Sequence, residues 1–320
     1  MSLEFGRGGF IKLGEESTYG TIASSMPVDN RIISASFQKT QEKERKTHLS
    51  QSGAGGFQNG HFDAFLNVGG SIDLPLLYEG TGMLLKAAIG ASSTTDLGAA
   101  ENPRYQHDYE PSTTGSIPSL SIGLQRGTGS YEVFLGCKVA TMNISGSAGE
   151  EITASFEVIA QNANARGTAT TASFGTGRQI FHFESGTLDF NSGNFKMKSF
   201  ELSLDNKLER RNVLGDKKTL EPITNDIREI TLNVTLEMEG NDLYNAYLAG
   251  TQSNLSFTFT NSDGDICNVL IRNCYIVDYD DAINTFGAIE RTMTFIGEGD
   301  TSNEPIRIRI TNNQASSVAN

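Results

Sequence analysis

The chain has 320 residues, a length that allows two domains, and its 34 glycines, seven prolines and lack of tryptophan are typical of many short strands and turns. Its formal net charge of -13 argues against a protein that binds nucleic acid through clustered Lys and Arg. No apolar run approaches the roughly 20 residues of a membrane-spanning helix, which argues against an integral membrane protein.

Residues 1–27 are rich in glycine and predict an extended N-terminal arm that docks on another surface. Glu4, Arg7 and Lys12 interrupt the apolar run that a signal peptide requires. We therefore expect the protein to be made and kept in the cytoplasm.

Two segments predict a half-buried strand followed by a long loop. Residues 31–39 alternate apolar and polar side chains, and residues 199–211 do the same in the second part of the chain. The loops that follow cover residues 41–67 and 206–226. Loops of this length inside a compact domain are usually functional, so we interpret them as arms that reach a neighbouring subunit; disordered surface loops are the alternative.

The chain is internally duplicated. In the sequence, residues 71–90 align with residues 231–250, and residues 137–160 align with residues 274–297. Each half shows strand-like alternation followed by a short helix ending in Gly. The helices are predicted over Thr81–Ile89 and Asn241–Ala249.

The duplication predicts a mainly β protein of two domains with one short helix each. The predicted segments are the arm 1–27, a first domain 28–161 with an insertion at 91–118, a linker 162–177, a second domain 178–299, and a C-terminal strand and tail 300–320. A duplicated β unit without a duplicated catalytic constellation favours a building block over an enzyme.

Candidate chemical sites have plainer interpretations. Asp263 and Asp265 flank Gly264 as at the start of a calcium loop, but the closing carboxylate is missing, and Asp-Gly between alternating strands predicts a hairpin. The acidic residues at 278, 280 and 281 are either a cation site or a solvated strand end. The three cysteines predict buried thiols, and we expect no metal, cofactor or catalytic group.

Three segments carry a resemblance to a known family: Gly9–Thr21, Val68–Gly90 and Ser199–Arg211. In this order they resemble the major tail tube proteins of long-tailed bacteriophages, in the branch whose subunit carries two tube domains in tandem. The resemblance implies a structural virion protein without catalytic activity. In that family each domain is a β-sandwich whose sheets join across subunits into a large β-barrel. A trimer of tandem subunits is then expected to form a pseudo-hexameric ring, and stacked rings the channel for DNA ejection.

The resemblance also implies partners and contact residues. The partners are further copies of the chain, a tape measure protein, an initiator or baseplate protein and a terminator; DNA passes without specific binding, and the protein resides in the virion tail after assembly in the host cytoplasm. Two sets of residues follow. The expected contact residues are Phe5, Phe10, Phe57, Phe62, Leu208, Leu214 and Leu220. The lumen candidates are Ser34, Ser36, Glu201 and Ser203.

Two alternatives stay open at this point. One is a baseplate or host-surface binding β-sandwich, which would form discrete oligomers. The other is the tube of a contractile injection system, built on the same fold with an effector cargo in place of DNA.

Overall fold

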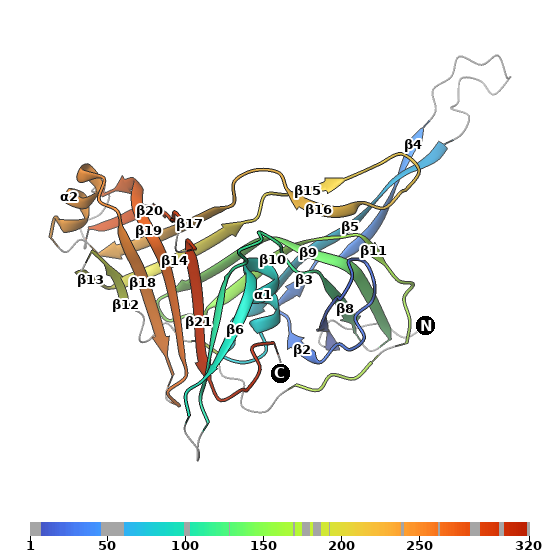
Figure 1. Cartoon of the computed structure of the whole chain (residues 1–320), viewed down its shortest axis with the longest axis horizontal. Coiled ribbons are helices and arrows are strands. Elements are labelled where there is room, and N and C mark those ends of the chain that lie inside the picture. Colours follow the sequence, from blue (N-terminus) through green and yellow to red (C-terminus); the bar gives the residue numbers. More distant parts are fainter. Residues whose placement is uncertain are drawn as a thin grey trace.

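The computed structural model describes residues 8–45, 61–98, 103–127, 129–168, 170–174, 180–181, 187–191, 193–237, 240–261, 263–281, 289–300 and 304–318. These residues form a mainly β structure with two short helices, so the predicted fold class is confirmed (Figure 1). Phe5 and Phe57 lie outside the described residues.

One antiparallel sheet, which we call the joint sheet, runs through both halves of the chain. Its strands, in spatial order, are β4 (Gln38–Arg45), β5 (His61–Pro75), β10 (Thr153–Ala160), β9 (Ser130–Ser147), β14 (Met197–Asp205), β17 (Glu229–Glu237), β20 (Glu290–Ile296) and β19 (Ile266–Asp280). The short strand β3 (Ser34–Ala35) pairs with β5 beside β4. The four strands of each half follow the same order, so the second half continues the first edge to edge.

Two further sheets cover the apolar face of the joint sheet. The first outer sheet contains β2 (Val28–Arg31), β1 (Phe10–Glu15), β8 (Leu120–Arg126), the beginning of β9 and β11 (Asn162–Ala163). The second contains β13 (Gly193–Phe195), β12 (Thr187–Phe190), β18 (Ser253–Thr260), the beginning of β19, β21 (Ile306–Asn312), β7 (Tyr105–Pro111) and β6 (Gly90–Asp96). The long strands β9 and β19 pass from an outer sheet into the joint sheet and thereby tie the layers together.

The two helices sit at the predicted places but differ in burial. Every residue of α1 (Gly82–Ile89) except Lys86 is buried, whereas α2 (Asp242–Ala249) buries only Leu243 and Ala246. Tyr244 and Leu248 of α2 are 42% and 64% exposed, although the ring of Tyr244 lies 5.5 Å from that of Tyr279 in β19, between centroids.

The insertion at 91–118 joins the two halves. Its hairpin β6–β7 pairs through β7 with the C-terminal strand β21, and β21 pairs in turn with β19 of the second half (Figure 1). Arg309 of β21 forms an ion pair with Asp108 of β7 at 2.6 Å. The insertion therefore completes the second outer sheet, and the C-terminal strand holds it there.

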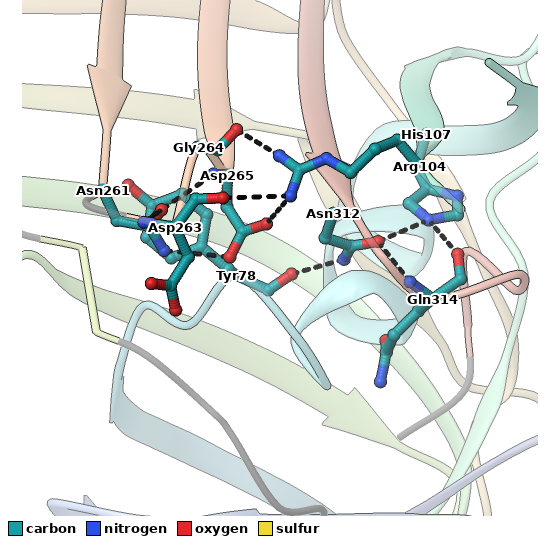
Figure 2. Close-up of polar contacts among 9 residues, drawn as sticks. All are labelled: Tyr78, Arg104, His107, Asn261, Asp263, Gly264, Asp265, Asn312 and Gln314. Carbon is teal, nitrogen blue, oxygen red and sulfur yellow. Dashed lines mark hydrogen bonds and ion pairs between the residues drawn. The ribbon is translucent and has the colours of Figure 1, made fainter. Parts of the chain in front are cut away.

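A buried histidine anchors this connection (Figure 2). His107 is 1% exposed; its Nε2 lies 3.1 Å from Oδ1 of Asn312 and 2.9 Å from the carbonyl oxygen of Gln314, and its Nδ1 lies 2.9 Å from Oγ1 of Thr94. The two acceptors place a hydrogen on Nε2, so Nδ1 accepts from the threonine hydroxyl when the ring is neutral.

Acid is expected to loosen the packing around His107. Burial lowers the pKa of His107 below its ordinary value of about 6.5, so below that pH the unfolded chain binds a proton that the folded chain resists. The His107 contribution to stability is therefore complete above about pH 6.5 and declines as pH falls towards the folded pKa. Thermal unfolding between pH 7.5 and 5 checks this, and His107→Gln should unfold with a smaller pH dependence. An equal dependence in both proteins contradicts it.

The described parts of the two predicted loops contain strands. Strands β4 and β5 run on as a hairpin arm, which extends beyond the body of the molecule (Figure 1). The second excursion folds as a two-stranded sheet of β15 (Leu208–Arg211) and β16 (Leu220–Thr224). This second hairpin lies over the first half, where Lys217 donates to Asp63 at 3.0 Å and its carbonyl oxygen accepts from the amide of Leu66 at 2.8 Å.

Candidate assembly surfaces

The two halves meet at a strand pair, β9 with β14. Its register runs from Ser147 opposite Ser199 to Thr141 opposite Asp205. The side chains on the inner face of this junction are apolar and buried: Met142, Ile144, Phe200, Leu202 and Leu204. The alternation of apolar and polar residues fixes this register, because a slip by one residue would turn the apolar set towards water.

Polar groups complete the junction at the end of α1. The buried side chain of Asn206 donates to the carbonyl oxygens of Ala88 and Val139 at 2.8 and 2.9 Å. Arg228 donates to the carbonyl oxygen of Ile89 at 2.9 Å. The second half thus caps carbonyl groups at the C-terminus of the first helix, which otherwise lack partners within a helix.

The other face of the joint sheet is polar from edge to edge. Its residues are mostly small hydroxyl and amide side chains, none of them buried: Ser34, Ser36, Ser71, Thr141, Asn143, Ser145, Thr153, Ser155, Ser199, Ser203, Thr231, Asn233, Thr235, Thr292 and Thr294. The four lumen candidates, Ser34, Ser36, Glu201 and Ser203, all lie on this face. The structure therefore brings them onto one surface.

This polar face is acidic. Its carboxylates are Asp73, Glu157, Glu201, Asp205, Glu229, Glu237, Asp278, Asp280 and Glu290. Lys198 bridges Glu237 and Glu290 at 3.3 and 2.6 Å, and Lys207 bridges Asp205 and Glu229 at 2.8 and 3.1 Å. The bridged lysines offset only part of this charge, so the face repels phosphate.

The expected contact residues fall into different environments. Phe62 is 49% exposed on the β4–β5 arm, and Leu214 is fully exposed at the turn between β15 and β16. Leu208 and Leu220 are half-buried in the second hairpin. These four are consistent with a surface that another molecule could cover.

Phe10 requires a correction. It lies in β1, which pairs with β2 and β8 of the same chain, and it is only 6% exposed. Its ring packs edge-on against Phe174 at 6.0 Å between centroids. Phe10 is therefore part of the chain's own core, because its strand completes the first outer sheet instead of extending away from it.

Two sheet edges stand open at the ends of the joint sheet. Within the described ranges, no strand pairs with the outer edge of β19 beyond Cys274, and none pairs with the outer edge of β4. Exposed edges of this length are templates for pairing with another chain. The sequence pattern alone gave no signal for which edges these would be.

The candidate chemical sites resolve as structural features. Asn261 accepts from the amides of Asp263 and Asp265 in the turn between β18 and β19, and Gly264 has φ 79°, so this segment is the predicted hairpin. No cluster of metal-binding side chains occurs among the residues that the structure describes. In the same residues, no helix is long and apolar enough to cross a membrane.

The three cysteines are buried and free of disulfides, as predicted. Burial raises the pKa of the thiols of Cys267 and Cys274 to about 12. The thiols are therefore protonated near neutral pH and unreactive as nucleophiles.

Comparison with known families decides the classification. The family described as phage tail tube protein matches residues 6–306, nearly the whole chain. The chain belongs to the phage tail tube protein family. A search of curated proteins found no match.

Membership in the tail tube family supports a structural role in the tail of a virion and assembly with copies of itself and with other tail proteins. Sequence reasoning missed two features that bear on assembly, namely the two open sheet edges and the contacts of Asn206 and Arg228 with α1.

Proposed function

We propose that this protein is the tail tube subunit of a phage and that it polymerises as rings, closed by the two open edges of the joint sheet, which stack into a tube. The observation that carries the proposal is the β9–β14 junction inside the chain. The counterpart of β9 in the second half is β19, and the counterpart of β14 in the first half is β4. Both counterparts have an open outer edge, so a copy can join the next as its own halves join.

The internal repeat specifies the register between copies. A bulge skips Ala140 in the β9–β10 pairing and Val277 in the β19–β20 pairing, which places the cysteine at 137 over the cysteine at 274. At the opposite edge, Ala35 of β3 corresponds to Phe200 of β14. The reason is that Ala35 pairs with Ile72 of β5 and Phe200 pairs with the equivalent residue of β17, Val234. The pair Asn143–Ser203 then predicts Asp280 opposite Gln38 of the next copy.

Heterologous contacts of this kind close into rings when the rotation between copies divides a full turn. Each chain contributes two strand sets, so a trimer gives the pseudo-hexameric ring that tandem tube domains imply. In this arrangement the proposed domains are residues 28–161 and 178–299, with the linker at 162–177.

We place the polar face of the joint sheet at the lumen. An acidic face without exposed clusters of Lys or Arg suits a conduit through which DNA slides without binding, since phosphate binding needs such clusters. The apolar face is already covered by the outer sheets, so the polar face is the one that remains for a water-filled channel. The role is structural and non-catalytic, with assembly in the host cytoplasm and with tape measure, initiator and terminator proteins as partners.

Ring closure is tested by a cross-link at the proposed register. The double variant Gln38→Cys and Asp280→Cys should give covalent trimers under mild oxidation, because opposite residues of an antiparallel pair lie within disulfide reach. The native cysteines are buried and should not compete. Non-reducing electrophoresis and negative-stain electron microscopy measure the products.

Each single variant is the matched control and should stop at dimers or monomers. If the wild-type protein forms tubes but the double variant gives no cross-link, the register between copies is refuted. Wild-type protein that stays monomeric at all concentrations and in the presence of the tail initiator would refute the assembly itself.

A further inference from the structure

A groove of about 760 Å³ opens over the second half of the chain. It lies where β14 and β20 end and where β17 begins, beside the loop that leads to β21. Its lining includes Leu204, Arg228, Ile230, Gly297, Glu298 and Glu304. The side chain of Ile227 at its margin is 85% exposed.

The equivalent place in the first half is filled. There the guanidinium of Arg210, from the β15–β16 hairpin, donates to the carbonyl oxygens of Val68 and, at 3.3 Å, Ala160. Lys217 of the same hairpin lies along β5. The second half therefore lays its own hairpin into the groove of the first half.

The carbonyl groups that receive Arg210 have direct counterparts in the open groove. Val68 pairs with Ala160, and in the second half the amide of Gly297 donates to the carbonyl oxygen of Ile230 at 3.1 Å. The register that places Ala140 over Val277 also places Ala160 over Gly297. Both Ile230 and Gly297 line the groove.

The arm of the first half carries the matching sequence. With Ala35 over Phe200, residues 41–46, Gln-Glu-Lys-Glu-Arg-Lys, lie over residues 206–211, Asn-Lys-Leu-Glu-Arg-Arg. Arg45 thus stands at the position of Arg210. The backbone irregularity also coincides, because a bulge interrupts β4 between Gln41 and Lys43, and Lys207 has φ 49° at the counterpart of the skipped residue.

Charge favours the same occupant. The groove is lined by four carboxylates, from Asp226, Glu229, Glu298 and Glu304. Lys207 already bridges Glu229, and Arg228 already donates to backbone carbonyl groups of α1. The remaining acidity favours residues 41–46 of the arm, whose three cations and two carboxylates leave a net charge of +1.

We propose that this groove is the docking site for the β4–β5 arm of a second copy of the chain, with Arg45 in the place that Arg210 takes in the first half. The site rests on the proposed function, since the head-to-tail order of copies brings the arm of one to the second half of another. Each ring contact then has two parts, a strand pair and an arm seated in a groove.

The test mixes two proteins that each carry one added cysteine, Arg45→Cys and Glu298→Cys, under assembly conditions with mild oxidation. A cross-linked dimer of the two proteins is expected, and it forms only between chains because each carries one new cysteine. The matched control replaces Arg45→Cys by Glu44→Cys, because neighbouring residues of a strand point to opposite faces and the two residues pair consecutively with β5. Equal cross-linking by the control would overturn the assignment of Arg45.

A second measurement does not depend on cysteines. Arg45→Ala should raise the protein concentration needed for assembly by about tenfold or more, because a charge-assisted contact to two backbone carbonyl groups is lost. Lys43→Ala should change it by less than about threefold. An Arg45→Ala protein that assembles like wild type would refute the docking site while ring closure through Gln38 and Asp280 still holds. Wild-type protein that stays monomeric even with the tail initiator would instead refute the proposed function.

Discussion

Replacing Phe200 by alanine is expected to cost about 3–5 kcal/mol of unfolding free energy, the largest effect on stability that we predict for a single side chain. Phe200 is 3% exposed, and its ring lies 5.1 Å from that of Phe257 and 5.7 Å from that of Phe259, between centroids. It therefore joins the joint sheet to the second outer sheet. It also stands opposite Gly146 at the junction of the halves, so the cavity would weaken both contacts.

Phe62→Ala is the matched control, because it removes the same atoms from a side chain that is 49% exposed. Its unfolding free energy should stay within about 0.5 kcal/mol of wild type. Chemical unfolding, followed by circular dichroism, measures both proteins. Similar losses in the two variants would mean that the packing of Phe200 does not carry the stability that its burial indicates.

The double substitution Glu201→Lys and Ser203→Lys is expected to have the largest effect on function. Both residues lie on the polar face of β14, and the pair of changes shifts the charge of that face by three units per chain. If that face lines the channel, assembled tubes should bind DNA at least tenfold more tightly at low salt, with an affinity that falls steeply as salt rises. Phage that carry these tubes should lose most of their infectivity, since DNA would adhere during ejection.

The control places the same charge change on the outward face. Asp189 and Ser256 oppose each other on β12 and β18 of the second outer sheet, so Asp189→Lys with Ser256→Lys adds the same three units elsewhere. DNA binding to tubes, measured by fluorescence anisotropy across a salt series, separates the two variants. Infectivity that is equally affected by both pairs would place the polar face away from the DNA.

The sequence predicted those features that depend on local pattern. Alternation located the main strands, the terminal glycines at 90 and 250 located the helix ends, and the Asp-Gly turn was found because its conformation needs a residue at positive φ. The polar face was predictable as well, because side chains of a strand alternate between two faces. Its four lumen candidates are on one surface for that reason.

Long-range pairing was beyond such reasoning. Nothing local in Tyr105–Pro111 indicates that it pairs with a strand 200 residues later, and the ion pair of Asp108 with Arg309 becomes visible only once the strands are adjacent. Phe10 was misassigned because glycines around a strand resemble those of a free arm. The structural and sequence alignments of the repeat also differ by two residues at β5. The strand pairing makes Ile72 equivalent to Val234, whereas the sequence repeat aligns Ile72 with Leu232.

The β9–β14 junction has a consequence for the kinetics of assembly. Because one of every two junctions in a ring of this kind is intramolecular, its partners meet at an effective concentration that does not depend on how much protein is present. A ring of three such chains brings together three bodies where six separate domains would bring together six, and each additional body loses translational and rotational freedom. In the proposed ring, tandem fusion would therefore lower the kinetic order of nucleation.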